Sequence, residues 1–377
     1  MAGIYLHIPF CRKACVYCDF HFITSLKAKS QMVEAIKREL YLRQDYLPIH
    51  SPLETVYFGG GTPSVLTPEE IEQLLETIRQ TYGIAPEAEI TLEANPDDLS
   101  AEFVQSLADL GINRLSVGTQ SFRDEDLAWM NRSHRGDQAI SSIQHAQAAG
   151  IHNLTIDLIL GLPNMDLDIW KAQVEQAIAL DIPHLSIYAL TVEHRTALHH
   201  QVQHDKIQLP EDSLAEQQYL WAHERLTEAG YDHYELSNYA KPGMYSRHNS
   251  AYWRGVPYLG VGPSAHSYDG NGRSWNVANN ARYLKLLEAG DSPVEESEVL
   301  TDRDAYHEYI MTQFRKRSGV DLSQIAMWGL KDWENRFNQE ISRFVASNWM
   351  VRTSTGYALT PKGWWMSDLI IREFFLD

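Results

Sequence analysis

Short runs of β-branched and aromatic residues alternate along this chain with longer stretches whose apolar residues recur at helical spacing. The runs lie at residues 4–8, 55–58, 89–94, 114–119, 154–160 and 184–190, and a weaker seventh lies near 233–240. Such alternation is typical of parallel strands joined by crossover helices, as in a barrel or a doubly wound sheet. The sequence therefore predicts an α/β fold for the first part of the chain.

One helix start is marked with unusual clarity. Thr67 can cap the helix, Pro68 suits its first position, and Glu70 is placed to complete a capping box. The pattern predicts that a helix begins directly after Thr67.

Residues that can carry chemistry follow the ends of the predicted strands. The stretch CRKACVYC follows the first strand and GGGTP the second, while Glu93 ends the third, Gln120 follows the fourth and Asp157 lies in the fifth. In barrels the loops after the strands converge on one mouth, so these residues are expected to meet there.

The pattern changes after about residue 300. A helical stretch at 301–322 precedes a segment at 348–375 that indicates a hairpin followed by a helix. We predict a small winged-helix-like α+β domain at 301–377, joined to the barrel of 1–240 by an extension at 241–300. Its apolar positions form a buried helix face or, less commonly, a partner surface; they are Trp364, Trp365, Leu369, Ile370 and Phe374.

Charge and composition exclude several classes of function. The 32 basic and 50 acidic residues give a net charge of −18, which disfavours nucleic acid as a main partner. The chain contains no run of ~18 uninterrupted apolar residues, which a helix needs to span a bilayer. The start, MAGIYLHIPF, lacks the basic residues and cleavage site of a secretory signal, so we expect a cytoplasmic protein.

The three cysteines of the chain, Cys11, Cys15 and Cys18, fall within eight residues. Three thiolates at this spacing can bind three irons of a 4Fe-4S cubane and leave the fourth iron open. A zinc site would need a fourth ligand, for which His7 or His21 is available. Ordinary buried cysteines are a third possibility, and the spacing alone leaves all three open.

The stretch YLHIPFCRKACVYCDF, in which Tyr17 precedes the third cysteine, closely resembles the opening of radical S-adenosylmethionine proteins of the HemN/HemW family. The motifs GGGTP, LEANP, SVGTQSF, IDLILGLP and HNSAYW follow in the family's order, so the resemblance covers nearly the whole chain. It implies a partial (β/α)6 barrel, a 4Fe-4S cluster on the three cysteines, and S-adenosylmethionine at the open iron.

The resemblance also implies which residues contact S-adenosylmethionine. Gly60, Gly61 and Thr62 would meet its methionine end, where glycine lets backbone come close to a ligand. Glu93 would accept hydrogen bonds from the ribose hydroxyls, as acidic residues do in dinucleotide sites.

Four further contacts are implied by the same resemblance. Gln120, Arg132 and Asp157 would surround the ribose and the methionine carboxylate, and the planar fork of Arg132 suits a carboxylate. Tyr5 would point from the first strand toward the cluster. The implied chemistry is one-electron reduction of the cluster followed by homolysis of the sulfonium to methionine and a 5′-deoxyadenosyl radical.

Two departures separate this chain from the coproporphyrinogen III oxidases of the family. They carry a further cysteine two positions beyond the third, where this chain has Phe20, and a long arm before the cysteine loop. Both departures, and the motif HNSAYW at 248–253, match the haem-chaperone branch. We therefore expect a haem chaperone, with an oxygen-independent coproporphyrinogen III oxidase and a zinc-stabilised barrel without redox role as alternatives.

The expected partners are haem or porphyrin as cargo, an electron donor, and a haem-acceptor protein for which the membrane is one location. His248 is the candidate haem ligand, because a histidine beside aromatic rings can bind haem iron; the alternative is a histidine satisfied by a polar loop. His194, His199, His200 and His204 lie close together but fit no pattern of the family, so we expect them to be solvated.

Overall fold

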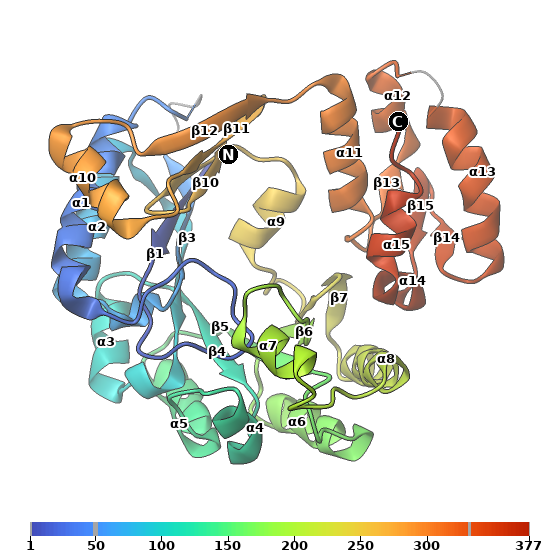
Figure 1. Ribbon diagram of the computed structural model, residues 1–377, viewed down its shortest axis with the longest axis horizontal. Coiled ribbons are helices and arrows are strands. Elements are labelled where there is room, and N and C mark those ends of the chain that lie inside the picture. Colours follow the sequence, from blue (N-terminus) through green and yellow to red (C-terminus); the bar gives the residue numbers. More distant parts are fainter. Residues whose placement is uncertain (1, 48–51, 331–332, 377) are drawn as a thin grey trace.

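The computed structural model describes residues 2–47, 52–330 and 333–376 and is built around one twelve-stranded sheet (Figure 1). Its six central strands run parallel and lie side by side in chain order, which confirms the six predicted strands. They are β1 (Gly3–Ile8), β2 (Leu53–Gly60), β3 (Ile84–Ala94), β4 (Arg114–Gln120), β5 (Asn153–Leu160) and β6 (His184–Ala189). The crossovers contain α1 (Lys29–Leu42), α2 (Pro68–Thr81), α3 (Ala101–Asp109), α4 (Asp124–Trp129), α5 (Gly136–Ala148) and α6 (Leu167–Ala179).

Local sequence explains why these elements form. Apolar and polar residues alternate along the central strands, because one face of the sheet packs against helices; Leu6, Phe58 and Leu158 on that face are fully buried. At the start of α2, Thr67 accepts from the backbone N–H of Glu70 and Glu70 accepts from that of Thr67, which confirms the predicted capping box.

The β6 edge of the sheet ends in a hairpin. The weak strand expected near 233–240 is two short antiparallel strands, β7 (Asp232–Glu235) and β8 (Asn238–Ala240), because the chain turns back at residues 236–237. The helices α7 (Ala197–Gln203) and α8 (Asp212–Glu228) precede this hairpin.

Residues 241–300 continue the same sheet beyond β1. They contribute α9 (Arg247–Trp253), β9 (Tyr258–Val261), β10 (His266–Tyr268), β11 (Gly272–Asn276), α10 (Asn280–Ala289) and β12 (Val294–Val299). Strand β9 pairs parallel with β1, and the next three strands are antiparallel. Gly262, with φ of +100°, makes this junction possible, because a Cβ there would lie 2.3 Å from the carbonyl oxygen of His7.

A buried polar cluster ties this segment to α1. Glu39 is fully buried, pairs with Arg43 at 3.2 Å, and accepts from the Tyr283 hydroxyl, the Asn276 amide and the backbone N–H of Gly262. A buried carboxylate is tolerated only when its oxygens find such partners, so the cluster fixes α10 and β11 against α1.

The C-terminal elements form a separate group at one side of the sheet (Figure 1). They are α11 (Asp302–Gln313), β13 (Val320–Asp321), α12 (Leu322–Met327), α13 (Trp333–Ala346), β14 (Met350–Arg352), β15 (Gly356–Leu359), α14 (Pro361–Trp365) and α15 (Ser367–Arg372). The three short strands form an antiparallel sheet in the order β13, β15, β14, so helices and a hairpin occur where a winged-helix-like domain was predicted.

The apolar face predicted at the C-terminus is mostly internal. Trp364, Ile370 and Phe374 are buried, whereas Leu369 is 50% exposed. The indole of Trp364 donates to the Phe314 carbonyl at 3.0 Å, and the ring of Trp365 packs on Tyr219 of α8 with centroids 5.6 Å apart. The Trp364 bond lies within the C-terminal domain, whereas the contact of Trp365 with Tyr219 attaches this domain to α8.

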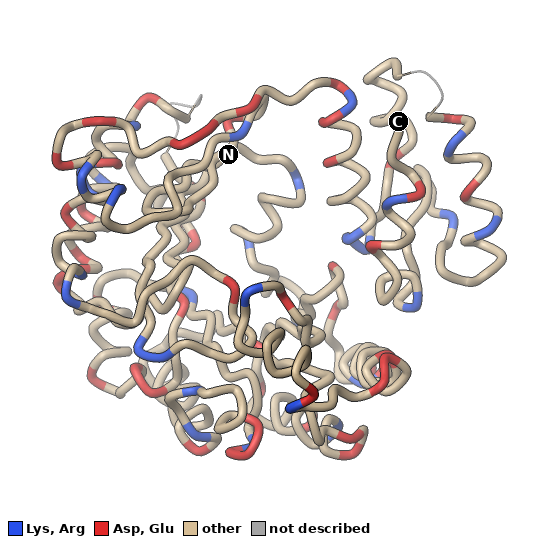
Figure 2. Tube along the Cα trace, viewed as in Figure 1, with Lys and Arg blue, Asp and Glu red and all other residues tan. Residues whose placement is uncertain are grey.

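The outer surface carries both signs of charge. Figure 2 shows acidic and basic residues interspersed along the outer helices. Among the residues that the structure describes, no helix has the length and apolar character needed to cross a bilayer.

Candidate cofactor site

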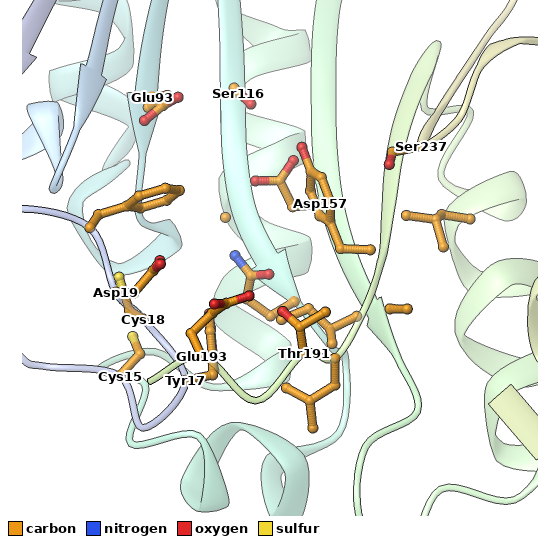
Figure 3. Close-up of a pocket in the computed structure, with 18 of the residues that line it drawn as sticks. Cys15, Tyr17, Cys18, Asp19, Glu93, Ser116, Asp157, Thr191, Glu193 and Ser237 are labelled. Carbon is orange, nitrogen blue, oxygen red and sulfur yellow. The ribbon is translucent and has the colours of Figure 1, made fainter. Parts of the chain in front are cut away.

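A cavity of about 710 Å³ opens at the C-terminal ends of the parallel strands, which is where the sequence predicted the chemistry to gather. We call it the cysteine cavity (Figure 3). Ten of the predicted site residues line it: Cys11, Cys15, Cys18, Gly60, Gly61, Thr62, Glu93, Gln120, Arg132 and Asp157. Cys15 and Cys18 lie on one side and Asp157 on the other. Trp364, Trp365, Ser367 and Asp368 of the C-terminal domain complete the wall.

The cysteine loop is closed at its base by backbone pairing. The N–H of Cys11 donates to the Ile23 carbonyl at 3.1 Å, and the N–H of Ile23 donates to the Pro9 carbonyl at 3.0 Å. All three thiols are free of disulfides and only partly buried. The loop therefore presents three thiols to the cavity from one short segment.

The surroundings of the sulfurs suit thiolates that bind a metal cluster. The Thr62 hydroxyl donates to Cys11 Sγ at 3.3 Å, and Arg132 Nη1 donates to Cys15 Sγ at 3.3 Å. Burial raises the pKa of the Cys11 and Cys18 thiols to about 11. A bound metal centre deprotonates its thiols, and hydrogen bonds to the sulfurs then stabilise the thiolates, so the residues present fit an iron-sulfur cluster.

The two histidines considered for zinc have other partners. His7 Nε2 bonds to the His21 carbonyl at 2.8 Å and its Nδ1 lies 3.2 Å from the Tyr5 hydroxyl, while His21 Nε2 bonds to Asn280 at 2.7 Å. Across residues 2–47, 52–330 and 333–376, no three His, Cys, Asp or Glu side chains are placed to hold a single metal ion. This arrangement offers no fourth ligand for the zinc alternative.

The glycine motif after β2 is required by close packing. Gly60 has φ of +107°, and a Cβ on Gly61 would lie 2.6 Å from the Phe10 carbonyl oxygen. The N–H groups of Gly61 and Thr62 donate to the carbonyls of Ile8 and Phe10 at 2.9 and 2.7 Å. The motif thus holds the start of the cysteine loop against β2, while its exposed side faces the cavity.

Two acidic side chains lie deep in the cavity. Burial raises the pKa of Glu93 to about 7, although the Tyr57 hydroxyl, 2.7 Å away, and the N–H of Gly60 both donate to the Glu93 carboxylate. Burial likewise raises the pKa of Asp157 to about 6. Carboxylates in such places favour hydroxyl donors, which a ribose supplies.

Arg132 follows α4 and is more constrained than the sequence indicated. Its Nη2 donates to Asn95 Oδ1 at 2.7 Å and to the Gly118 carbonyl at 2.8 Å, while its Nε is buried without a partner. The expected two-bond pairing with a methionine carboxylate must therefore be corrected, because both N–H groups of Nη2 are occupied. The partnerless Nε remains as a donor for an anionic group.

Three cavity residues were missed by sequence reasoning although all three lie in quoted motifs. Asn95 of LEANP and Gly118 of SVGTQSF position Arg132, and a Cβ on Gly118 would lie 3.1 Å from both Arg132 Nη2 and Gln120 Nε2. Ser116 also lines the wall. Gln120 itself has φ of +64°, a left-handed conformation at the end of β4.

Tyr5 and His248 do not reach the cysteine cavity. Tyr5 lines a separate depression and stacks on Tyr57 with centroids 6.1 Å apart, and its expected direction toward the cluster stays a prediction. His248 is only 2% exposed; its Nδ1 bonds to Thr55 Oγ1 and its Nε2 to the Tyr252 hydroxyl, both at 2.8 Å. Both ring nitrogens are engaged, which disfavours His248 as a haem ligand.

The histidine group around α7 shows no convergence on the cavity. His194 and His199 form one ring pair and His200 and His204 another, with centroids 4.8 and 4.1 Å apart. His194, His200 and His204 are exposed and His199 is partly exposed, in agreement with the expectation that they are solvated.

Comparisons with known proteins identify the families that the chain matches. Residues 5–173 match the family model of the radical SAM superfamily, and residues 300–366 match that of the HemN C-terminal domain. The heme chaperone HemW of Lactococcus lactis is 32% identical over 376 residues, covering 99% of this chain and 97% of the relative. The heme chaperone HemW of Mycobacterium tuberculosis is 37% identical over 328 residues, covering 86% and 84%.

Among solved structures, coproporphyrinogen III oxidase (HemN) of Escherichia coli matches with a TM-score of 0.85 and 23% identity, covering 99% of this chain and 90% of that one. This likeness shows a shared fold. The family matches and the near full-length relatives show that the chain belongs to the radical SAM superfamily and, within it, to the HemW family.

Proposed function

We propose that this protein is a haem chaperone, which binds haem and delivers it to an acceptor protein with the help of a 4Fe-4S cluster and S-adenosylmethionine. Support comes from relatives named heme chaperone HemW that match along nearly the whole chain. The observation that carries the cofactor part is the cysteine cavity, in which three thiols of one loop face two half-buried carboxylates, those of Glu93 and Asp157.

The proposed division of work follows the contacts in the cavity. Cys11, Cys15 and Cys18 would hold the cluster, which together with S-adenosylmethionine supplies one-electron reductive cleavage of the sulfonium when bound. Glu93 would accept from the ribose hydroxyls. The Nε of Arg132 would face the methionine carboxylate.

The remaining predicted contacts lie around the same ligand. Gly60, Gly61 and Thr62 would approach the methionine end with their backbone, because a side chain at the glycines would close the gap to the cysteine loop. Asp157 and Gln120 would complete the polar wall near the ribose.

One wall of the cysteine cavity differs from the pattern of the oxidases, which disfavours the oxidase alternative. Phe20, which stands where the oxidases of the family carry a further cysteine, lines the cysteine cavity and is 68% exposed. Productive decarboxylation requires one propionate to be held at the reacting carbon, and a changed wall removes such positioning even where cofactor chemistry survives. Cargo binding without turnover is the outcome we infer.

Delivery requires partners beyond haem. We infer an electron donor for the cluster and a haem-acceptor protein, with the membrane as one place where the acceptor could reside, and we place the protein in the cytoplasm. An acidic net charge of −18 favours docking partners with basic surfaces.

The test uses the full chain, reconstituted anaerobically. It should bind haem and should not convert coproporphyrinogen III to protoporphyrinogen IX under reducing conditions with S-adenosylmethionine. A functional oxidase of the family serves as positive control for the assay. Stoichiometric release of carbon dioxide from the porphyrinogen would replace the chaperone proposal by the oxidase alternative.

A further inference from the structure

A second hollow of about 340 Å³ adjoins the cysteine cavity, because Asp19 and Phe20 belong to the walls of both. Its remaining wall comes from the loop residues His21 and Ser264, from β9, and from β1, β10 and α9, which Figure 1 labels. Tyrosine rings and histidines dominate this wall. We call it the second hollow.

His266, at the start of β10, is the histidine of this wall whose two ring nitrogens are both free. It is exposed, and neither of its ring nitrogens has a hydrogen-bond partner within the described part of the chain. His7 has both nitrogens engaged, and Nε2 of His21 is bonded to Asn280. Burial and the nearby Arg273 lower the pKa of His266, which keeps its imidazole neutral and its lone pair available.

The strand register surrounds His266 with aromatic rings. Tyr268 pairs with Tyr258, and His266 pairs with Trp275, so these four side chains share one face of the sheet. The rings of His266 and Trp275 are 5.8 Å apart. An exposed imidazole on an aromatic face is a combination that suits a flat, apolar, metal-containing ligand.

The HNSAYW motif contributes to this hollow through Tyr252. His248 Nε2 bonds to the Tyr252 hydroxyl at 2.8 Å, and the Tyr252 ring meets Tyr258 edge to face at 4.5 Å. Since His248 also stacks on Tyr57 at 4.9 Å, it is held rigidly and in turn holds Tyr252 against the hollow. The buried histidine of the motif therefore acts as a positioning residue.

We propose that the second hollow is the haem site, that His266 is an axial ligand of the haem iron, and that Tyr252 and Tyr258 contact the porphyrin face. This proposal rests on the proposed haem-chaperone function and names where the cargo sits. A volume of about 340 Å³ is near the lower end of the ~300 to 1,000 Å³ of ligand pockets, so part of the macrocycle would stay outside. Partial enclosure suits a cargo that must leave again.

Phe20 gains a role from this placement. It is 68% exposed, lines both cavities, and stands at the boundary between the proposed haem site and the cofactor site. The residue that departs from the oxidase pattern is thus the one that would separate cargo from cluster.

The experiment titrates haem into the reconstituted full chain and into the variants His266→Ala, His248→Ala and His152→Ala. His152 is an exposed histidine just before β5, which lies four strands away from β1 in the sheet, and serves as the matched control. Affinity is read from the Soret band, and the axial ligand from electron paramagnetic resonance of the ferric complex. Iron and sulfide content confirms that each variant is folded and loaded.

We expect His266→Ala to lose the resonance signature of a histidine ligand. Its affinity for haem should fall by at least ~10- to 100-fold, which is the loss seen when a residue that only supports a metal ligand is changed. Added imidazole should restore the signature. His248→Ala should weaken binding while keeping the signature, because it displaces a wall and removes no ligand. His152→Ala should match the wild type.

The outcomes separate the two proposals. If His266→Ala binds haem with the affinity and spectrum of the wild type, the proposed site is overturned and the chaperone function stands. Loss of the histidine-ligand signal in His248→Ala but not in His266→Ala would also overturn the proposed site. It would show that His248 binds the haem iron after the HNSAYW motif rearranges. A wild-type chain that binds no haem would contradict both.

Discussion

Glu93 offers the sharpest quantitative test of the cysteine cavity. A carboxylate has about four acceptor positions. The Tyr57 hydroxyl and the Gly60 N–H use two of them, which leaves two for the two hydroxyls of a ribose. In Glu93→Gln the single amide oxygen already accepts from these two donors. The amide NH2 group faces the ligand instead of a carboxylate oxygen, so it cannot accept from the ribose hydroxyls.

The change keeps the volume of the side chain, so the loss is electrostatic. Losing a hydrogen bond to a charged group costs about 1.5 to 3 kcal/mol, which is roughly one to two decades in the affinity for S-adenosylmethionine. Iron content should stay unchanged, because Glu93 is not a cluster ligand. Tyr57→Phe, which frees an acceptor position and leaves the carboxylate in place, should alter affinity by less than about tenfold.

Calorimetric titration of the reconstituted protein measures these affinities. A 2′,3′-dideoxy analogue of S-adenosylmethionine completes the cycle. The wild type should prefer the natural ligand over the analogue, and Glu93→Gln should not. If Glu93→Gln loses affinity equally for both ligands, the assignment of Glu93 to the ribose is refuted.

Three other expectations concern the cluster, the cavity wall and the fold. Anaerobic reconstitution should load about four irons per chain, with an absorption band that bleaches on reduction, and Cys15→Ala should abolish it; a full cluster in that variant would contradict the site. Arg132→Ala should lower both S-adenosylmethionine affinity and cluster retention, because Arg132 also donates to Cys15 Sγ, whereas an effect on one alone would argue against its double role. Burial raises the pKa of Glu235 from 4.5 to about 7, so between these pH values the folded state keeps a proton that the unfolded state loses. The free energy of unfolding should therefore fall as the pH rises from 4.5 to 7, by on the order of 3 kcal/mol. Urea denaturation of Glu235→Gln should lack that decline, and parallel pH profiles for variant and wild type would disprove the assignment.

What the sequence determined is local. Strand periodicity, the cap at Thr67 and the spacing of three cysteines each depend on residues a few positions apart, and the structure has them where they were expected. The meeting of strand ends at one mouth also followed, because parallel strands with helical crossovers align their C-terminal ends.

What only the tertiary structure decided depends on partners distant in the chain. The sequence made His248 a candidate haem ligand beside aromatic residues, yet Thr55, 193 residues earlier, bonds to one of its nitrogens and Tyr252 to the other. The sequence indicated that Arg132 could pair with a carboxylate through two hydrogen bonds, but in the structure its Nη2 donates to Asn95 and Gly118.

The pairing of β9 with β1 had a further effect that no local pattern shows. It continues the sheet beyond β1 and places His266 and Tyr258 beside Tyr5, which forms a second hollow next to the cysteine cavity. The motifs in the sequence show which functional groups are present. Long-range packing and hydrogen bonding determine which of these groups remain available to bind a ligand, because a buried donor or acceptor must find a partner within the fold.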